Sequence, residues 1–287
     1  MGRKAILLTA VLALVWAGLG VATPAAAQKT CLVVDTDVGV DDYRALAVVA
    51  PARDLRAVVV TEGISGVPNG ATAVSMFLAG RGVSPPVLPG LASPSPPVYD
   101  WLPPVRAAAE RMNNFLGAAV PARGTPDRLA KGVRAAVLGC GRVEVLVLGP
   151  WTSYPRYAAA LGGHPGIVAS GRSFAENNPD NFNCEYDLAA CRTAPRRAVY
   201  VDLPASPAYD PTEEMVARLG HTGRPGLLKA ALLADPSQWL GTRLWDDTAA
   251  LSLVEPGVFA PRGGHLEPTV GEAAFRELVV AAINRSG

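Results

Sequence analysis

Four carboxylates stand within eight residues of the sequence. They are Asp35, Asp37, Asp41 and Asp42, and Gly39 lets the chain turn between them. Carboxylates packed this closely repel one another, so their pKa values rise unless a cation neutralises them. Hard cations prefer oxygen ligands. The cluster therefore indicates a binding site for Ca²⁺ or Mg²⁺.

Two other interpretations of this cluster remain open. One is a solvated acidic turn that caps a helix, because acidic side chains are favoured at a helix N-terminus. The other is an aspartate nucleophile for phosphoryl transfer, as in haloacid dehalogenase-type enzymes, with Asp246-Asp247 as a late acidic motif. Gly39 stands where those enzymes usually have Thr or Val, which argues against this interpretation. The spacing does not fit an EF-hand loop either.

The segments that must position the cluster alternate between strand-like and helix-like patterns. Apolar runs predict strands at Leu32–Val34, Leu55–Thr61, Pro86–Leu88, Val143–Leu148 and Ala198–Val201. Helical patterns cover residues 43–50, 70–79, 127–137, 154–161, 212–219, 225–234, 245–253 and 272–284, and residues 90–104 form a loop rich in Pro and Ser. This alternation predicts an α/β fold with a single open, mostly parallel sheet flanked by helices and a Rossmann-like core.

In such folds, ligands bind beyond the carboxyl ends of the strands. The run Asp35–Asp42 follows the first predicted strand directly, and Trp151–Ser153 follows another. We therefore expect both segments at the functional edge of the sheet.

The first 27 residues have the pattern of a secretory signal peptide. Arg3 and Lys4 precede the apolar stretch Ala5–Val21, and small residues then lead to a cleavage site after Ala27. A permanent membrane anchor is the alternative. Cleavage leaves residues 28–287 as one periplasmic or secreted domain with no membrane attachment. The net charge of +1 makes nucleic acid a poor partner.

In an exported protein, the cysteines are expected to form disulfides, because the compartment is oxidising. The even set Cys31, Cys140, Cys184 and Cys191 permits three pairings in an oxidising compartment. Cys31 and Cys140 each precede a strand-like run, which favours their pairing if those strands are neighbours, and Cys184 then pairs with Cys191. Free buried thiols are the alternative.

Read as a whole, Val33–Asp42 resembles the N-terminal signature of the nucleoside hydrolases, the inosine-uridine-preferring family. Three later segments look like family motifs in order and rough spacing: Leu146–Ser153, Asn181–Ala190 and Leu244–Ala250. The resemblance spans about residues 30 to 262 and implies a Ca²⁺-dependent hydrolase of the N-glycosidic bond of ribonucleosides. Family members are often dimers or tetramers, so a homodimer or tetramer is implied as well.

The resemblance also assigns roles on the metal side. Asp37, Asp42 and Asp246 would bind Ca²⁺ through carboxylates, and Thr152 through its backbone carbonyl. Asp37 would also act as the general base on a water bound to the cation, since a nearby carboxylate can take its proton. Asp35 would support the loop without touching the metal.

On the sugar side, the resemblance places Asp41 at the ribose 2′-hydroxyl and Asn183 at the 3′-hydroxyl. Asn181 stands where the family usually has a glutamate for the 5′-hydroxyl, and an amide can still make that hydrogen bond without charge. Asn178 is a further candidate for the 5′-hydroxyl, together with Asn177 and Glu176. These departures indicate that the substrate-binding positions differ from the family pattern more than the metal-binding positions do.

Two tryptophans bear on the leaving base. Trp245 precedes Asp246, as a tryptophan does in the purine-specific inosine-adenosine-guanosine branch, which this chain resembles here. Trp101 lies in the loop from which that branch supplies a second stacking tryptophan. Sandwiching would raise the basicity of the purine and help it leave. Ordinary packing is the alternative for both, and Trp151 could be a further wall or core.

A purine ribonucleosidase for salvage is the function that these motifs favour. The alternative is a secreted ribose- or nucleoside-binding protein of the same fold that kept calcium and lost turnover. Release of ribose from nucleosides separates the two.

Overall fold

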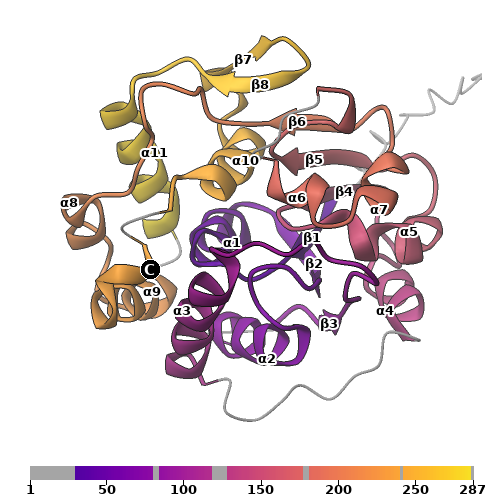
Figure 1. Cartoon of the computed structure of the whole chain (residues 1–287), viewed down its shortest axis with the longest axis horizontal. Coiled ribbons are helices and arrows are strands. Elements are labelled where there is room, and N and C mark those ends of the chain that lie inside the picture. The colour runs from indigo at the N-terminus through magenta and orange to yellow at the C-terminus, as the bar shows by residue number, and fades with distance from the viewer. Residues whose placement is uncertain (1–29, 80–83, 118–127, 177–180, 240–241, 286–287) are drawn as a thin grey trace, which may run out of the picture.

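The computed structural model describes residues 30–79, 84–117, 128–176, 181–239 and 242–285. Within these ranges, the chain forms one eight-stranded sheet with helices on both faces (Figure 1). The strands lie in the order β3-β2-β1-β4-β5-β6-β8-β7. Their bounds are β1 Thr30–Thr36, β2 Asp54–Val60, β3 Val87–Pro89, β4 Arg142–Val147, β5 Gly166–Ser170, β6 Val199–Val201, β7 Phe259–Arg262 and β8 His265–Pro268.

The strands pair in parallel except for β7, which runs antiparallel to β8. The α-helices of the described chain are α1 Val40–Ala52, α2 Val67–Leu78, α3 Leu102–Phe115, α4 Leu129–Ala136, α5 Tyr154–Tyr157, α6 Phe182–Glu185, α7 Leu188–Arg192, α8 Glu213–Ala217, α9 Gly223–Ala234, α10 Trp245–Val254 and α11 Glu272–Asn284. This architecture confirms the predicted α/β fold class.

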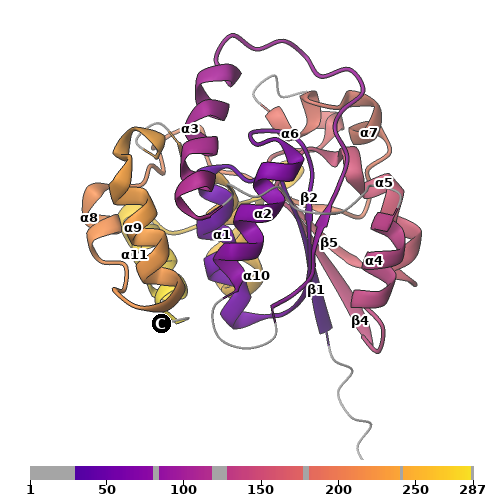
Figure 2. The ribbon, with the colours of Figure 1, turned by 90° about the horizontal axis from the view of Figure 1, so that it is seen from below.

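Two apolar cores sandwich the sheet, because successive side chains of a strand point to opposite faces. In β1, Leu32 and Val34 face the core under α1, α2 and α10, whereas Val33 faces the core under α4 and α5. Figure 2 shows these helix layers on either side of the strands. Burial on both faces explains why the central strands are continuous apolar runs in the sequence.

Several elements differ from the expectations. Helix α3 begins at Leu102, inside the segment expected to be loop, because proline is tolerated in the first turn of a helix and Pro103 and Pro104 lie there. Strand β5 and the hairpin of β7 and β8 were not predicted. They are short, with four or five residues each, so their periodicity is weak.

Both disulfide pairings favoured by the sequence are confirmed. Cys31 pairs with Cys140 and Cys184 pairs with Cys191. The first pair forms because β1 and β4 are neighbours and Cys31 lies opposite Val143 in the parallel register. The expected signal peptide lies outside the described residues. Within the described part of the chain, no helix is long and apolar enough to cross a membrane.

Candidate functional site

The acidic cluster lies where β1 ends and α1 begins, and α10 adds a further carboxylate to it. Asp41 and Asp42 stand in the first turn of α1, and Asp246 stands in the first turn of α10. The two helices lie side by side (Figure 1). One carboxylate oxygen from each of these three aspartates lies within 4.8 Å of the others. The fold therefore brings together groups that are 204 residues apart, from 42 to 246.

Asp37 is buried beside this group and tightly enclosed. Its Oδ2 accepts a hydrogen bond of 2.9 Å from the backbone N–H of Ile64. Glycines surround it, because a Cβ atom on Gly63 would lie 2.1 Å from Asp37 Oδ2 and one on Gly149 would lie 2.8 Å from Asp37 Cβ. Burial, and then the charge of Asp42, hold the pKa of Asp37 well above its usual value.

Asp42 is fixed by donors from its own loop. Its carboxylate accepts hydrogen bonds from the Thr36 hydroxyl and, at 2.7 Å, from the backbone N–H of Gly39. The bond to Gly39 also caps the start of α1. Burial raises the pKa of Asp42 in spite of these donors. These donors hold the side chain in one orientation, although burial disfavours its charged form.

The loop between Asp37 and Asp42 contains an unusual backbone conformation. Val38 has a φ of 60°, in the left-handed region that a branched residue rarely adopts. A proline could not adopt this φ, because its ring fixes φ near −65°. The loop therefore follows a path that would not allow a proline at position 38.

Asp35 is fully buried and is hydrogen-bonded to residues of neighbouring elements. Its carboxylate accepts hydrogen bonds from Thr61 at 2.5 Å and from the Tyr157 hydroxyl at 2.8 Å. Burial is the main cause that raises the pKa of Asp35 to about 7. These partners come from the end of β2 and from α5, so Asp35 ties three elements together beneath the cluster.

The donor set fits a hard divalent cation. Burial, together with the neighbouring carboxylates, raises the pKa of Asp246 well above its usual value, and burial with Asp42 raises that of Asp41 to about 7. Such groups hold protons unless a cation replaces them. Two oxygens bound to one Ca²⁺ at about 2.4 Å lie at most about 5 Å apart, which the spacing of Asp41, Asp42 and Asp246 satisfies. Asp41, expected at the sugar, belongs to this group, whereas Asp37, expected as a ligand, does not.

Other residues proposed from the sequence lie at the same edge of the sheet. Thr152 is buried in the short 3₁₀ segment Trp151–Ser153 that follows β4, and its Oγ1 has no hydrogen-bond partner among the described residues. The Asn183 amide donates a 2.6 Å hydrogen bond to the carbonyl of Leu148. Leu148 in turn donates its N–H to the Asp35 carbonyl at 2.7 Å. Asn183 is thus attached to the strand end beside the cluster.

Asn181 is buried, and its side-chain amide donates a hydrogen bond to the Arg172 carbonyl. Gly171 leaves room for it, with a φ of 92° that favours glycine. Asn181 therefore holds the loop after β5 in place. Asn178, the other candidate for the sugar 5′-hydroxyl, lies outside the described residues.

The tryptophans have different surroundings. Trp245 is 40% exposed at the start of α10, and the Arg243 guanidinium lies 5.8 Å from its ring centroid. Trp101 is 46% exposed and packs against Tyr99 and Phe182, with ring centroids 5.1 and 5.3 Å apart. Trp151 is 1% exposed. Of the two roles left open for Trp151, the structure shows core packing.

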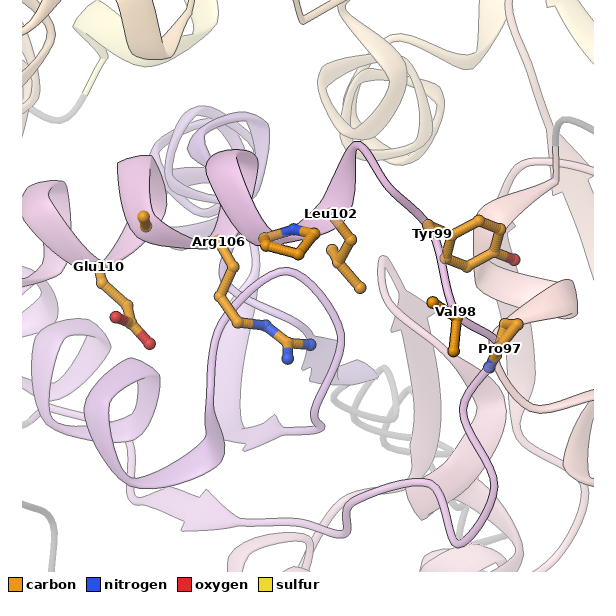
Figure 3. A pocket seen from close by; sticks show the side chains of 8 residues that line it. Pro97, Val98, Tyr99, Leu102, Arg106 and Glu110 are labelled. Carbon is orange, nitrogen blue, oxygen red and sulfur yellow. The ribbon is translucent and has the colours of Figure 1, made fainter.

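A second polar network had no signal in the sequence. Arg106 of α3 donates to the Gly63 carbonyl, to the Ile64 carbonyl at 3.3 Å and to the Tyr186 hydroxyl at 3.1 Å. Figure 3 shows Arg106 reaching from its helix toward that loop, at a pocket that Tyr99 and Glu110 also line. Arg106 thereby holds the loop whose N–H groups bind Asp37. Only the tertiary fold reveals this, since these contacts span 42 residues or more.

Comparison with known proteins gives similarity in structure alone. No family model and no curated protein matches the sequence. The inosine-uridine preferring nucleoside hydrolase from Bacillus anthracis has a TM-score of 0.63 at 13% identity, over 90% of this chain and 99% of that one. The purine-preferring ribonucleoside hydrolase from Gardnerella vaginalis has 0.60 at 14%, over 88% and 98%. The type III effector protein XopQ, complexed with adenosine diphosphate ribose, has 0.59 at 16%, over 91% and 93%.

Proposed function

We propose that this chain, which has the nucleoside hydrolase fold, hydrolyses the N-glycosidic bond of ribonucleosides to ribose and free base. The observation that carries the proposal is the convergence of carboxylates from α1 and α10 within 4.8 Å. They converge at the carboxyl edge of a parallel sheet, where α/β enzymes bind their ligands.

The proposed cofactor is Ca²⁺. Asp37, Asp42 and Asp246 would hold it through carboxylates, with the carbonyl of Thr152. Of these ligands, Asp42 and Asp246 lie within 4.8 Å of each other and of Asp41, and the raised pKa values of these three carboxyl groups support a hard cation. When bound, the cation would supply Lewis acidity that lowers the pKa of water at the site.

Asp37 is the proposed general base. Its second oxygen is held by the Ile64 N–H, so the carboxylate has one orientation from which it can take a proton. Glycoside cleavage passes through an oxocarbenium-like state, and the negative charge of Asp41 and Asp42 beside the sugar would stabilise it. In this proposal, Asp37 takes the proton, and Asp41 and Asp42 stabilise the positive charge that develops on the sugar.

The ribose would be oriented by Asp41 at the 2′-hydroxyl and by Asn183 at the 3′-hydroxyl, with Asn181 and Asn178 toward the 5′-hydroxyl. Asp41 belongs to the same oxygen group as Asp42 and Asp246, so sugar and cation would meet there. A site that binds a hydroxyl with buried polar groups rejects the deoxy analogue strongly, by about 10⁴-fold or more.

We further propose a preference for purines. The exposed ring of Trp245 directly precedes Asp246, and Trp101 packs beside α6, which carries Asn183. Trp245 therefore lies on the helix that carries Asp246, and Trp101 contacts the helix that carries Asn183, which supports stacking of both rings on a base. Two disulfides support the proposed export, since such bonds persist in oxidising compartments.

The test is release of free ribose from inosine, adenosine, guanosine and uridine, with Ca²⁺ and with EDTA. We expect turnover with Ca²⁺, loss in EDTA, and loss in the Asp37→Ala variant. Turnover that survives both EDTA and Asp37→Ala would overturn the calcium mechanism. Binding of nucleosides without ribose release would instead favour a ribose-binding protein, an alternative supported by the ADP-ribose complex of XopQ.

A further inference from the structure

A buried ion pair joins the two helices that carry the acidic group. Arg44 of α1 and Asp247 of α10 have side chains that are 1% and 0% exposed. Arg44 Nε lies 3.0 Å from both carboxylate oxygens of Asp247, and Arg44 Nη2 lies 2.9 Å from Oδ2. The guanidinium therefore contacts both carboxylate oxygens, through Nε and Nη2.

Arg44 also holds the chain that leads into α10. Its Nη2 donates a 3.2 Å hydrogen bond to the carbonyl of Arg243, two residues before the helix begins. One guanidinium thus fixes both the first turn of α10 and its entry. In sequence, these residues flank the proposed ligands, since Arg44 follows Asp42 by two positions and Asp247 follows Asp246 directly.

Such a pair needs an explanation other than stability. Removing two charges from water costs more than their attraction commonly returns, and apolar residues of similar volume often serve the fold as well or better. Compared with apolar packing, an ion pair fixes the relative orientation of the two side chains. The planar guanidinium accepts a carboxylate only in certain orientations.

We propose that Arg44 and Asp247 form a positioning pair for the cation site, which sets Asp246 of α10 against Asp41 and Asp42 of α1. The proposal rests on the proposed function, because it assumes that these carboxylates bind Ca²⁺. Neither residue is expected to touch the cation or the substrate. Their effect is exerted through the relative placement of the two helix N-termini.

The pair has a second consequence for charge. Against the effect of burial, the charge of Asp247, and then those of Asp41 and Asp246, raise the pKa of the Arg44 guanidinium. Asp247 pairs with the Arg44 guanidinium from the α10 side of the contact between α1 and α10. Loss of the Asp247 carboxylate would leave Arg44 free to turn toward the proposed ligands and to compete there with Ca²⁺.

The test is calorimetric titration of the full chain with Ca²⁺, which does not depend on turnover. Three variants are compared with wild type: Asp247→Asn, Arg44→Lys, and the double variant Arg44→Met/Asp247→Leu. We expect the dissociation constant to rise about 10- to 100-fold in Asp247→Asn and in the double variant, as for other partners that orient metal ligands. Arg44→Lys keeps the charge without the forked contact, so a smaller rise is expected.

The double variant separates positioning from simple stability, because its apolar pair can restore packing. Thermal unfolding in EDTA shows which variants fold. A folded double variant with the wild-type dissociation constant overturns the inference, and if it does not fold, an unchanged constant in Arg44→Lys overturns it. Failure of wild type to bind Ca²⁺ overturns the proposed function as well. Arg218→Met/Glu277→Leu removes an exposed ion pair between the residue that follows α8 and helix α11; it is the matched control and should bind as wild type.

Discussion

Gly63 lies so close to Asp37 that a Cβ atom added to it would fall 2.1 Å from the Asp37 Oδ2 atom. The neighbouring Ile64 donates its backbone N–H to the same oxygen at 2.9 Å. The proposed general base is therefore placed by backbone that has no room for a side chain. Arg106 holds this loop from the other side through the carbonyls of Gly63 and Ile64.

Gly63→Ala is expected to displace Asp37 and lower kcat/KM on inosine about 100-fold, since a shift of about 1 Å at a catalytic group costs about that much. Steady-state kinetics measure the loss, and thermal unfolding shows that the variant folds. Gly66→Ala is the matched control, because a Cβ there meets no atom within 4 Å. Equal kinetics for the two variants would contradict the proposed role of Asp37.

Removal of Ca²⁺ should make stability depend on pH in a defined direction. Burial raises the pKa of Asp41 from 3.8 to about 7. Between these values the folded apoprotein binds more protons than the unfolded chain, so its free energy of unfolding falls as pH rises from about 4 through 7. Thermal unfolding in EDTA across this range measures the trend.

Ca²⁺ should oppose that trend, because it binds the deprotonated carboxylates. The rise in Tm on adding Ca²⁺ is therefore expected to be larger at pH 8 than at pH 5. Asp41→Asn should flatten the pH dependence in EDTA. A protein that in EDTA grows steadily more stable from pH 5 to pH 8 would contradict these pKa directions.

Trp245→Ala should lower kcat/KM more for inosine than for uridine. Loss of an aromatic stack is worth about 0.5–1.5 kcal/mol, or up to about tenfold, and a purine offers the larger ring system. Trp245→Phe should retain part of the rate. Equal losses on inosine and uridine would mean that Trp245 has a packing role only, as the nearby Arg243 side chain would allow.

The two disulfides should contribute unequally to stability. Cys31–Cys140 closes a sequence separation of 109 residues and Cys184–Cys191 closes one of 7. Loop-closure entropy predicts losses of about 5 and about 2.5 kcal/mol, respectively, on their removal. Denaturant unfolding of Cys31→Ser/Cys140→Ser and Cys184→Ser/Cys191→Ser measures both. A larger loss from the short loop would contradict the entropic argument.

The fold class could be predicted because its signals are local. Buried parallel strands such as β1 and β4 are apolar runs, and α1 and α10 carry aspartates in their first turns. The same locality made β5 and the hairpin of β7 and β8 hard to predict, since four or five residues carry little periodicity. The prolines at positions 103 and 104 indicated loop, although the first turn of a helix accepts them.

The sequence by itself determined the local features of this protein: a dense run of carboxylates after a buried strand and an even set of four cysteines. Only the tertiary structure decided which partners surround these residues. Arg44 meets Asp247 across 203 residues, Tyr157 meets Asp35 across 122, and Trp151 turns into the core. The physical reason is that carboxylate repulsion and strand periodicity act between neighbours in the chain, whereas burial, ion pairing and close backbone approach depend on which elements pack together.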